Sequence, residues 1–79
     1  MNQPQHEQIH AIFPSSDRAI DIAQYITSLV NKEGGACLCL VTDQARWRLL
    51  LNVPPQLAEQ LQQTGEAMSF QIERGRQTA

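Results

Sequence analysis

The chain has 79 residues, a formal net charge of −2, and a composition that is 42% hydrophobic and 18% charged. This length predicts one domain over residues 1–79 with a thin margin of stability, because so short a chain buries only ~60–65% of its unfolded surface. The six basic residues are scattered, which argues against a duplex-binding surface. No apolar run approaches the ~20 residues that span a bilayer, and the start has no signal-peptide pattern. We therefore expect a cytoplasmic protein with no membrane contact.

The first element that the pattern predicts is a strand. Residues 1–7 are polar and are expected to form a flexible arm. Residues 8–13 alternate between apolar and polar, and Pro14 ends the run because proline cannot donate to a strand ladder. One face of this strand carries Ile9, Ala11 and Phe13.

A helix is predicted at 16–33, with a serine cap before it and Gly34-Gly35 after it. Its apolar residues recur at steps of three and four and form a single stripe. The stripe consists of Ala19, Ile22, Ala23, Ile26, Leu29 and Val30. Ile20 and Tyr25 fall off the stripe, and we expect them at its margin or in contact with something else.

Two strands are predicted next, at 36–42 and 46–53, joined by a short turn. The segment 36–42 is apolar on both faces, which is typical of a strand that is covered on both sides. The segment 46–53 alternates, with its inward face formed by Trp47, Leu49, Leu51 and Val53.

A second helix is predicted at 55–64, opened by Pro55 and stopped by Gly65. Its inward side chains are Leu57, Ala58 and Leu61. The last predicted strand, 68–74, alternates, and its apolar residues are Met68, Phe70 and Ile72. Residues 75–79 are polar and are expected to form a flexible tail.

The order of these elements is β-α-β-β-α-β, which is one of the recurring two-layer motifs. The sequence therefore predicts an α+β fold, a ferredoxin-like two-layer sandwich. Its four-stranded antiparallel sheet would have the strand order 4-1-3-2 and would carry both helices on one face.

The turn between the second and third strands decides which side chains face the helices. A loop with an even number of residues pairs Leu40 with Trp47 and Leu38 with Leu49, which places both leucines in the core. The common three-residue loop requires a left-handed residue, for which Ala45 is poorly suited. We therefore favour the even loop.

The even loop places Cys37, Cys39 and Val41 on the outer sheet face, with Cys39 across from Arg48 and Cys37 across from Leu50. Nothing in the chain would cover that face, because both helices lie on the other side. An apolar centre with an arginine-containing rim is the composition of an interface. The predicted interaction surface consists of Ile12, Cys37, Cys39, Val41, Arg46, Arg48 and Leu50.

Cys37-x-Cys39 is the only chemical motif that needs weighing. Two residues along one strand lie roughly 6.6–6.8 Å apart at Cα, the outer edge of disulfide geometry. As a metal site the pair supplies two thiolates of the about four that zinc needs, so His10 or a second copy would have to complete it. The simpler interpretation is two packed thiols that behave as small apolar residues.

These patterns predict no enzyme and no cofactor, because no catalytic pairing and no phosphate-binding glycine loop is present. We expect a non-enzymatic protein-interaction module, a homodimer that serves as regulator, adaptor or inhibitor, as small phage and plasmid proteins do. If the outer face is the dimer seam, Tyr25 and the glutamine-rich second helix become the working surface.

Two alternatives stay open at this point. One is a nucleic-acid-binding regulator, which would use Arg46, Arg48, Arg74 and Arg76. The other is a metal or small-molecule site at a dimer interface, which would use Cys37 and Cys39.

Overall fold

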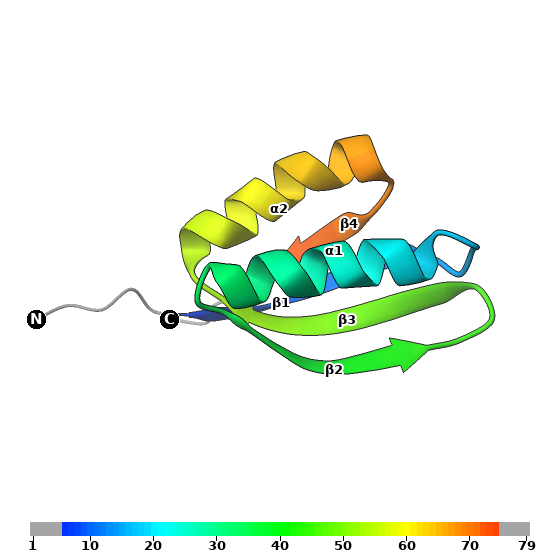
Figure 1. Cartoon of the computed structure of the whole chain (residues 1–79), viewed down its shortest axis with the longest axis horizontal. Coiled ribbons are helices and arrows are strands. Elements are labelled where there is room, and N and C mark those ends of the chain that lie inside the picture. The colour runs from blue at the N-terminus through cyan, green and yellow to red at the C-terminus, as the bar shows by residue number, and fades with distance from the viewer. Residues whose placement is uncertain (1–5, 75–79) are drawn as a thin grey trace, which may run out of the picture.

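The computed structural model describes residues 6–74 as a sheet of four strands and two helices. The elements are, in chain order, β1 (Glu7–Pro14), α1 (Ala19–Lys32), β2 (Ala36–Thr42), β3 (Arg46–Val53), α2 (Pro55–Met68) and β4 (Gln71–Arg74). Neighbouring strands are antiparallel, in the order β2-β3-β1-β4, and both helices lie on one side of the sheet (Figure 1). The predicted α+β class and antiparallel four-stranded sheet are confirmed. Neither helix within residues 6–74 is long and apolar enough to cross a membrane.

The two predicted flexible ends fall largely on residues 1–5 and 75–79, which lie outside the described part of the chain. The predicted arm is nevertheless too long, because Glu7 is the first residue of β1. His6 also contacts the fold, since its Nε2 atom lies 3.1 Å from the carbonyl oxygen of Gly34.

The hydrophobic core lies between the helices and the sheet face beneath them. Full burial of one large aliphatic side chain in such a core is worth about 1.5–3 kcal/mol. Apart from Leu38 and Leu40, the side chains predicted to point inward are buried or packed against the core. Trp47 lies against Phe13 with ring centroids 6.1 Å apart. The buried members are Ile9, Ala11, Phe13, Ala19, Ile22, Ile26, Val30, Leu49, Leu51, Val53, Leu57, Ala58, Leu61 and Phe70.

Helix α1 begins later than predicted, because the residues after β1 form a turn. In this turn the Ser16 hydroxyl accepts a hydrogen bond from the Arg18 N–H (3.2 Å), and the Ser16 carbonyl accepts one from the Ala19 N–H (3.0 Å). Arg18 occupies the N-cap position and makes no side-chain cap bond. The serine therefore closes the turn before the helix and does not cap the helix itself.

Helix α2 runs past Gly65 to Met68, so the prediction that Gly65 ends it is wrong. The left-handed residue at its end is Ser69 (φ 67°), and the Phe70 N–H donates to the Gly65 carbonyl at 3.1 Å. A Cβ atom at residue 65 would collide with the Phe70 carbonyl oxygen and lie 2.9 Å from Cδ1 of that ring. Glycine is thus required because the Phe70 backbone and ring approach residue 65 closely. Since α2 is longer than predicted, β4 (Gln71–Arg74) is shorter than the predicted strand 68–74.

The pairing of β2 with β3 differs from the prediction by two residues near the turn. Leu40 lies opposite Leu49, and neither Leu40–Trp47 nor Leu38–Leu49 is a pair. Leu38 is an extra residue with no partner on β3, because the register shifts between Cys37 and Cys39. This is a β-bulge, in which one strand contributes an additional residue.

The bulge sends the two cysteines to opposite faces of the sheet. Cys37 lies opposite the buried Leu51 on the helix side, and Cys39 lies opposite Leu50 on the outer side. The predicted neighbours, Arg48 for Cys39 and Leu50 for Cys37, are therefore wrong, as is the placement of Cys37 on the outer face. Alternation along a strand holds only while no residue is inserted.

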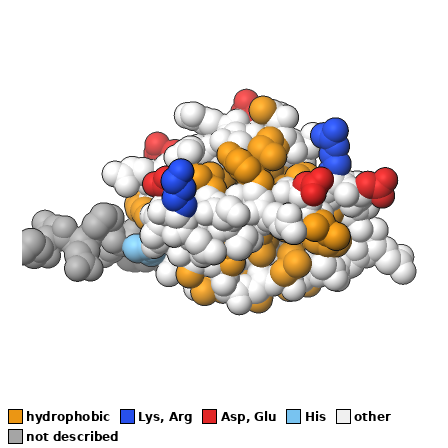
Figure 2. All heavy atoms as spheres, viewed as in Figure 1, with side chains coloured by type: hydrophobic (Ala, Val, Ile, Leu, Met, Phe, Trp, Pro, Cys, Tyr) orange, Lys and Arg blue, Asp and Glu red, His pale blue; other side chains and the backbone are white. Residues whose placement is uncertain are grey.

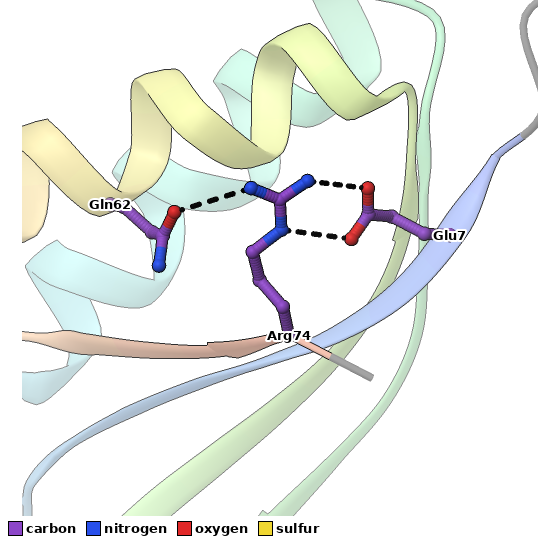
Figure 3. A network of polar contacts seen from close by, with 3 residues as sticks. All are labelled: Glu7, Gln62 and Arg74. Carbon is purple, nitrogen blue, oxygen red and sulfur yellow. Dashed lines mark hydrogen bonds and ion pairs between the residues drawn. The ribbon is translucent and has the colours of Figure 1, made fainter. Parts of the chain in front are cut away.

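An ion pair joins the first and the last strand at one end of the sheet (Figure 3). The Arg74 guanidinium donates through Nε to Glu7 Oε1 (3.0 Å) and through Nη2 to Glu7 Oε2 (2.8 Å), and Nη1 lies 3.4 Å from Gln62 Oε1. These charge-assisted hydrogen bonds hold the pKa of Glu7 below its ordinary value. The contact thus ties β1, β4 and α2 together.

Candidate interaction surface

The outer face of the sheet is more polar than predicted. Ile12 is only 5% exposed, and its cross-strand neighbours there are Arg48 on β3 and Gln71 on β4. Glu73 Oε1 lies 3.9 Å from both Arg48 Nη1 and His10 Nδ1, so a small polar network spans three strands. The predicted apolar centre of this face is therefore largely covered within one chain.

The structure separates the residues that were predicted to form one surface. Ile12 is buried, Leu50 is half-buried, and Cys37 lies on the other face, where its thiol is 3.5 Å from the Thr27 hydroxyl of α1. Cys39 and Val41 are exposed at the edge. The remaining predicted members, Arg46 and Arg48, are exposed on β3.

The exposed apolar surface lies along β2, the strand at one edge of the sheet. Leu38, Leu40 and Val41 are 48%, 44% and 56% exposed, so the prediction that Leu38 and Leu40 lie in the core is wrong. The cause is position: β2 has no further strand beside it, and the contact with α1 is at Cys37, near the start of the strand. Figure 2 shows hydrophobic side chains over β2 and below α1, whereas the charged side chains in that view lie over the helices.

Ile20 of α1 extends this apolar surface above the sheet. It is 56% exposed, and it lies seven residues before Thr27, which places both on the helix side that faces β2. From Thr27 back to Ile20, α1 advances about 10.5 Å. From Cys37 to Leu40, β2 advances about 10 Å in the same direction, because β2 runs antiparallel to α1. Ile20 therefore lies toward the end of β2 that carries Leu40. We call the set Ile20, Leu38, Cys39, Leu40 and Val41 the edge patch.

The backbone of β2 also has groups that β3 does not use. The Asp43 N–H donates to the Arg46 carbonyl at 3.0 Å, so the amide of Asp43 points toward β3. In an antiparallel ladder, successive residues point alternately toward and away from the partner strand. Val41 and Cys39 thus bond to β3, and the N–H and C=O groups of Leu40 and Thr42 point to the free side of the sheet.

The edge patch carries no charge, and the turn beyond it is fixed by one carboxylate. No residue from 36 to 42 is charged. Asp43 Oδ1 accepts hydrogen bonds of 2.8 Å from the backbone N–H groups of both Ala45 and Arg46. These two bonds hold the pKa of Asp43 below its ordinary value. The carboxylate is therefore used to close the hairpin.

The two cysteines do not form a shared metal site, because they lie on opposite sheet faces. Both are free thiols, and among residues 6–74 no group of three or more His, Cys, Asp or Glu side chains converges on a point that could hold a metal ion. Cys37 fills space beside α1, as the packed-thiol interpretation expects.

The arginines of the nucleic-acid alternative do not form one basic surface. Arg74 is bound to Glu7 on the helix side of the sheet, while Arg48 lies near Glu73 on the outer side. Arg76 lies outside the described residues.

A groove of about 620 Å³ opens at the end of the sheet where β1 and α2 finish. Its apolar floor comes from strand residues and Phe70, and Arg46 and Glu66 stand on its rim. The lining residues are Ile12, Phe13, Pro14, Ala45, Arg46, Gly65, Glu66, Ser69, Phe70 and Gln71. Among the residues that the structure describes, no polar or charged residue is buried, in this groove or elsewhere.

Comparison with known proteins identifies no relative. No family model, no curated protein and no solved structure matches this chain.

Sequence reasoning missed Leu38, Leu40 and Ile20 as members of the surface. The signal for Ile20 was present, since it falls off the apolar stripe of its helix. For β2, a run that is apolar on both faces predicts a strand covered on both sides, but here it belongs to a strand at the sheet edge.

Proposed function

We propose that this protein is a small, non-enzymatic interaction module that acts by contact through the edge patch. One observation carries the proposal: an edge strand without any charge or proline exposes three aliphatic side chains and the backbone groups of Leu40 and Thr42. Proteins that stay monomeric usually protect such edges with charges, proline, bulges or a covering element. In β2 the bulge interrupts only the first half, so the stretch from Cys39 to Thr42 remains regular.

Strand addition is the binding mode that this edge supports. An added strand gains affinity from main-chain hydrogen bonds and specificity from side chains on both faces. The patch offers Val41 and Cys39 on the outer face and Leu40 on the helix face.

The proposal also includes a fold family, a cellular compartment and a class of protein. Read from β4, the strand order is 4-1-3-2, which supports a ferredoxin-like assignment. Free thiols at Cys37 and Cys39 support a reducing compartment such as the cytoplasm. A regulator, adaptor or inhibitor is the class of protein that such a module would serve.

Site-specific photo-crosslinking in cells that produce the full chain tests this proposal. A photoreactive amino acid at Val41 is expected to give covalent protein adducts, whereas the same group at the exposed Gln63 of α2 gives none above background. Leu40→Lys in the Val41 probe chain should abolish the adducts, because a charge on an edge opposes strand addition. Gln63→Lys, the matched control, should leave them unchanged. Equal yields from Val41 and Gln63, or no adduct at Val41, would contradict the proposal.

A further inference from the structure

We infer that the partner at the edge patch is a second copy of this chain, which adds its own β2 in antiparallel orientation with Leu40 opposite the partner's Leu40. The inference rests on the proposed function and names the occupant of the same surface. The two sheets then join into one continuous sheet around a two-fold axis that passes between the two Leu40 residues.

The hydrogen-bonding phase of β2 permits this register. A residue on a two-fold axis of an antiparallel pair can exchange both backbone bonds with its own copy only if its N–H and C=O point to the free side. Leu40 meets this condition, because the Asp43–Arg46 bond directs Asp43, Val41 and Cys39 toward β3. Thr42 then lies opposite the partner's Leu38, so five residues of each copy, 38–42, face one another, with the bulge residue Leu38 at the end of the paired stretch.

The side chains of β2 are complementary to themselves in this register. On the outer face, Val41 lies beside the partner's Cys39 on both sides of the axis, so each exposed aliphatic group meets a small apolar one. On the helix face the two Leu40 side chains meet. No charged side chain from 36 to 42 is brought against a like charge.

The flank of α1 enlarges the contact beyond the strands. Because α1 contacts β2 through Thr27 and Cys37, joining two copies along β2 would bring their α1 helices toward each other on the same side of the sheet. The facing flank carries no charge, and its exposed apolar residue is Ile20. A shallow groove of about 320 Å³ beside it is lined by Ala23, Gln24, Thr27 and Ser28.

The area requirement also favours a two-chain assembly. Stable interfaces bury at least about 1,200 Å² in total, so a contact that includes the helix flank as well as the strand meets this requirement more readily. A second copy supplies both elements at once, whereas an extended peptide would cover the strand and leave Ile20 exposed. Self-association would also relieve the thin stability margin of a chain this short.

Sedimentation of the full chain gives the first test. The wild type is expected to sediment at twice the 8.9 kDa chain mass. Leu40→Pro should sediment as a single chain with an unchanged circular dichroism spectrum, because proline at an edge position removes only an amide that faces away from β3. Gln63→Ala, on the opposite side of the molecule, should remain a dimer. A wild type that stays monomeric would overturn the inference.

Disulfide trapping tests the register and does not depend on the proline variant. In a chain carrying Cys37→Ala and Cys39→Ala, Leu40→Cys is expected to cross-link to its copy on mild oxidation. The two Cα atoms of a hydrogen-bonded pair lie ~5.5 Å apart, within disulfide range. Val41→Cys in the same background should not cross-link, because its copy lies diagonally at ~7–8 Å. A cross-link at residue 41 but not at residue 40 would refute the Leu40-centred register.

The two proposals fail in distinguishable ways. If the photoreactive group at Val41 captures a different protein while the wild type sediments as a monomer, the second copy is excluded as partner and the interaction module stands. If the group at Val41 captures nothing and the wild type is a monomer, both are wrong.

Discussion

Replacement of Gly65 by alanine is expected to destabilise the protein, against the usual trend for a helix interior. In an open helix, alanine is more favourable than glycine by about 1 kcal/mol. Here the added Cβ would collide with the Phe70 carbonyl oxygen and lie 2.9 Å from Cδ1 and 3.0 Å from Cε1 of the Phe70 ring. The carbonyl is backbone, so it cannot swing aside as the end of a long side chain would.

The expected magnitude follows from two costs and one gain. Overpacking of a filled site costs about 1–3 kcal/mol. Displacing Phe70 also weakens its N–H bond to the Gly65 carbonyl, which is worth about 1 kcal/mol. After the propensity gain is subtracted, Gly65→Ala should lose about 1–3 kcal/mol of unfolding free energy.

Thermal unfolding followed by circular dichroism measures this loss. For a domain of this size, 1 kcal/mol corresponds to a Tm change of roughly 4–8 °C. The matched control is Gln63→Ala, an exposed position in the same helix, which should change Tm by only a few degrees in either direction. A Gly65→Ala protein as stable as the wild type, or more stable, would refute the close approach of Phe70.

Two further predictions concern stability. Glu7→Gln removes the carboxylate that pairs with Arg74 and whose pKa is lowered in the folded state. The ion pair therefore stabilises the fold above the ordinary pKa of 4.5, and this stabilisation is lost as pH falls through the lowered value. We expect Glu7→Gln to lower the free energy of unfolding by about 1 kcal/mol at pH 7, a modest value because Arg74 is about one-third exposed. The loss should be smaller at pH 3, and an equal loss at both pH values would contradict the ion-pair argument. Ser69→Gly should raise the free energy of unfolding by up to about 1 kcal/mol, because Ser69 adopts a left-handed conformation that costs glycine little. Ser28→Gly, at an exposed position inside α1, should instead lower it, and chemical denaturation of the three variants gives the comparison.

The sequence was sufficient to predict the element order, the sheet class and most of the core, because these depend on periodicity. Ile9, Phe13 and Leu49 are buried where alternation places them, and the stripe of α1 faces the sheet. The role of Gly65 was not predictable from the local pattern, because it depends on the close approach of Phe70, five residues away.

The surface was predicted less well, and one residue explains most of the difference. The bulge at Leu38 leaves no mark in the hydrophobic pattern, yet it moves Cys37 from the outer face to the helix side. The exposure of Leu40 follows from the place of β2 at the sheet edge, which depends on strand order and on how far the helices reach. Ile12 is likewise buried at a position whose cross-strand neighbours belong to two other strands.

The two margins of this sheet are unequal, and that inequality limits how many chains can join. β4, at the opposite margin from β2, has only four residues, and two of them are Glu73 and Arg74, both held in ion pairs. Short, charged margins resist further addition. A pair formed through β2 would present only these closed margins to solution, so growth would stop at two subunits and not continue into a fibre.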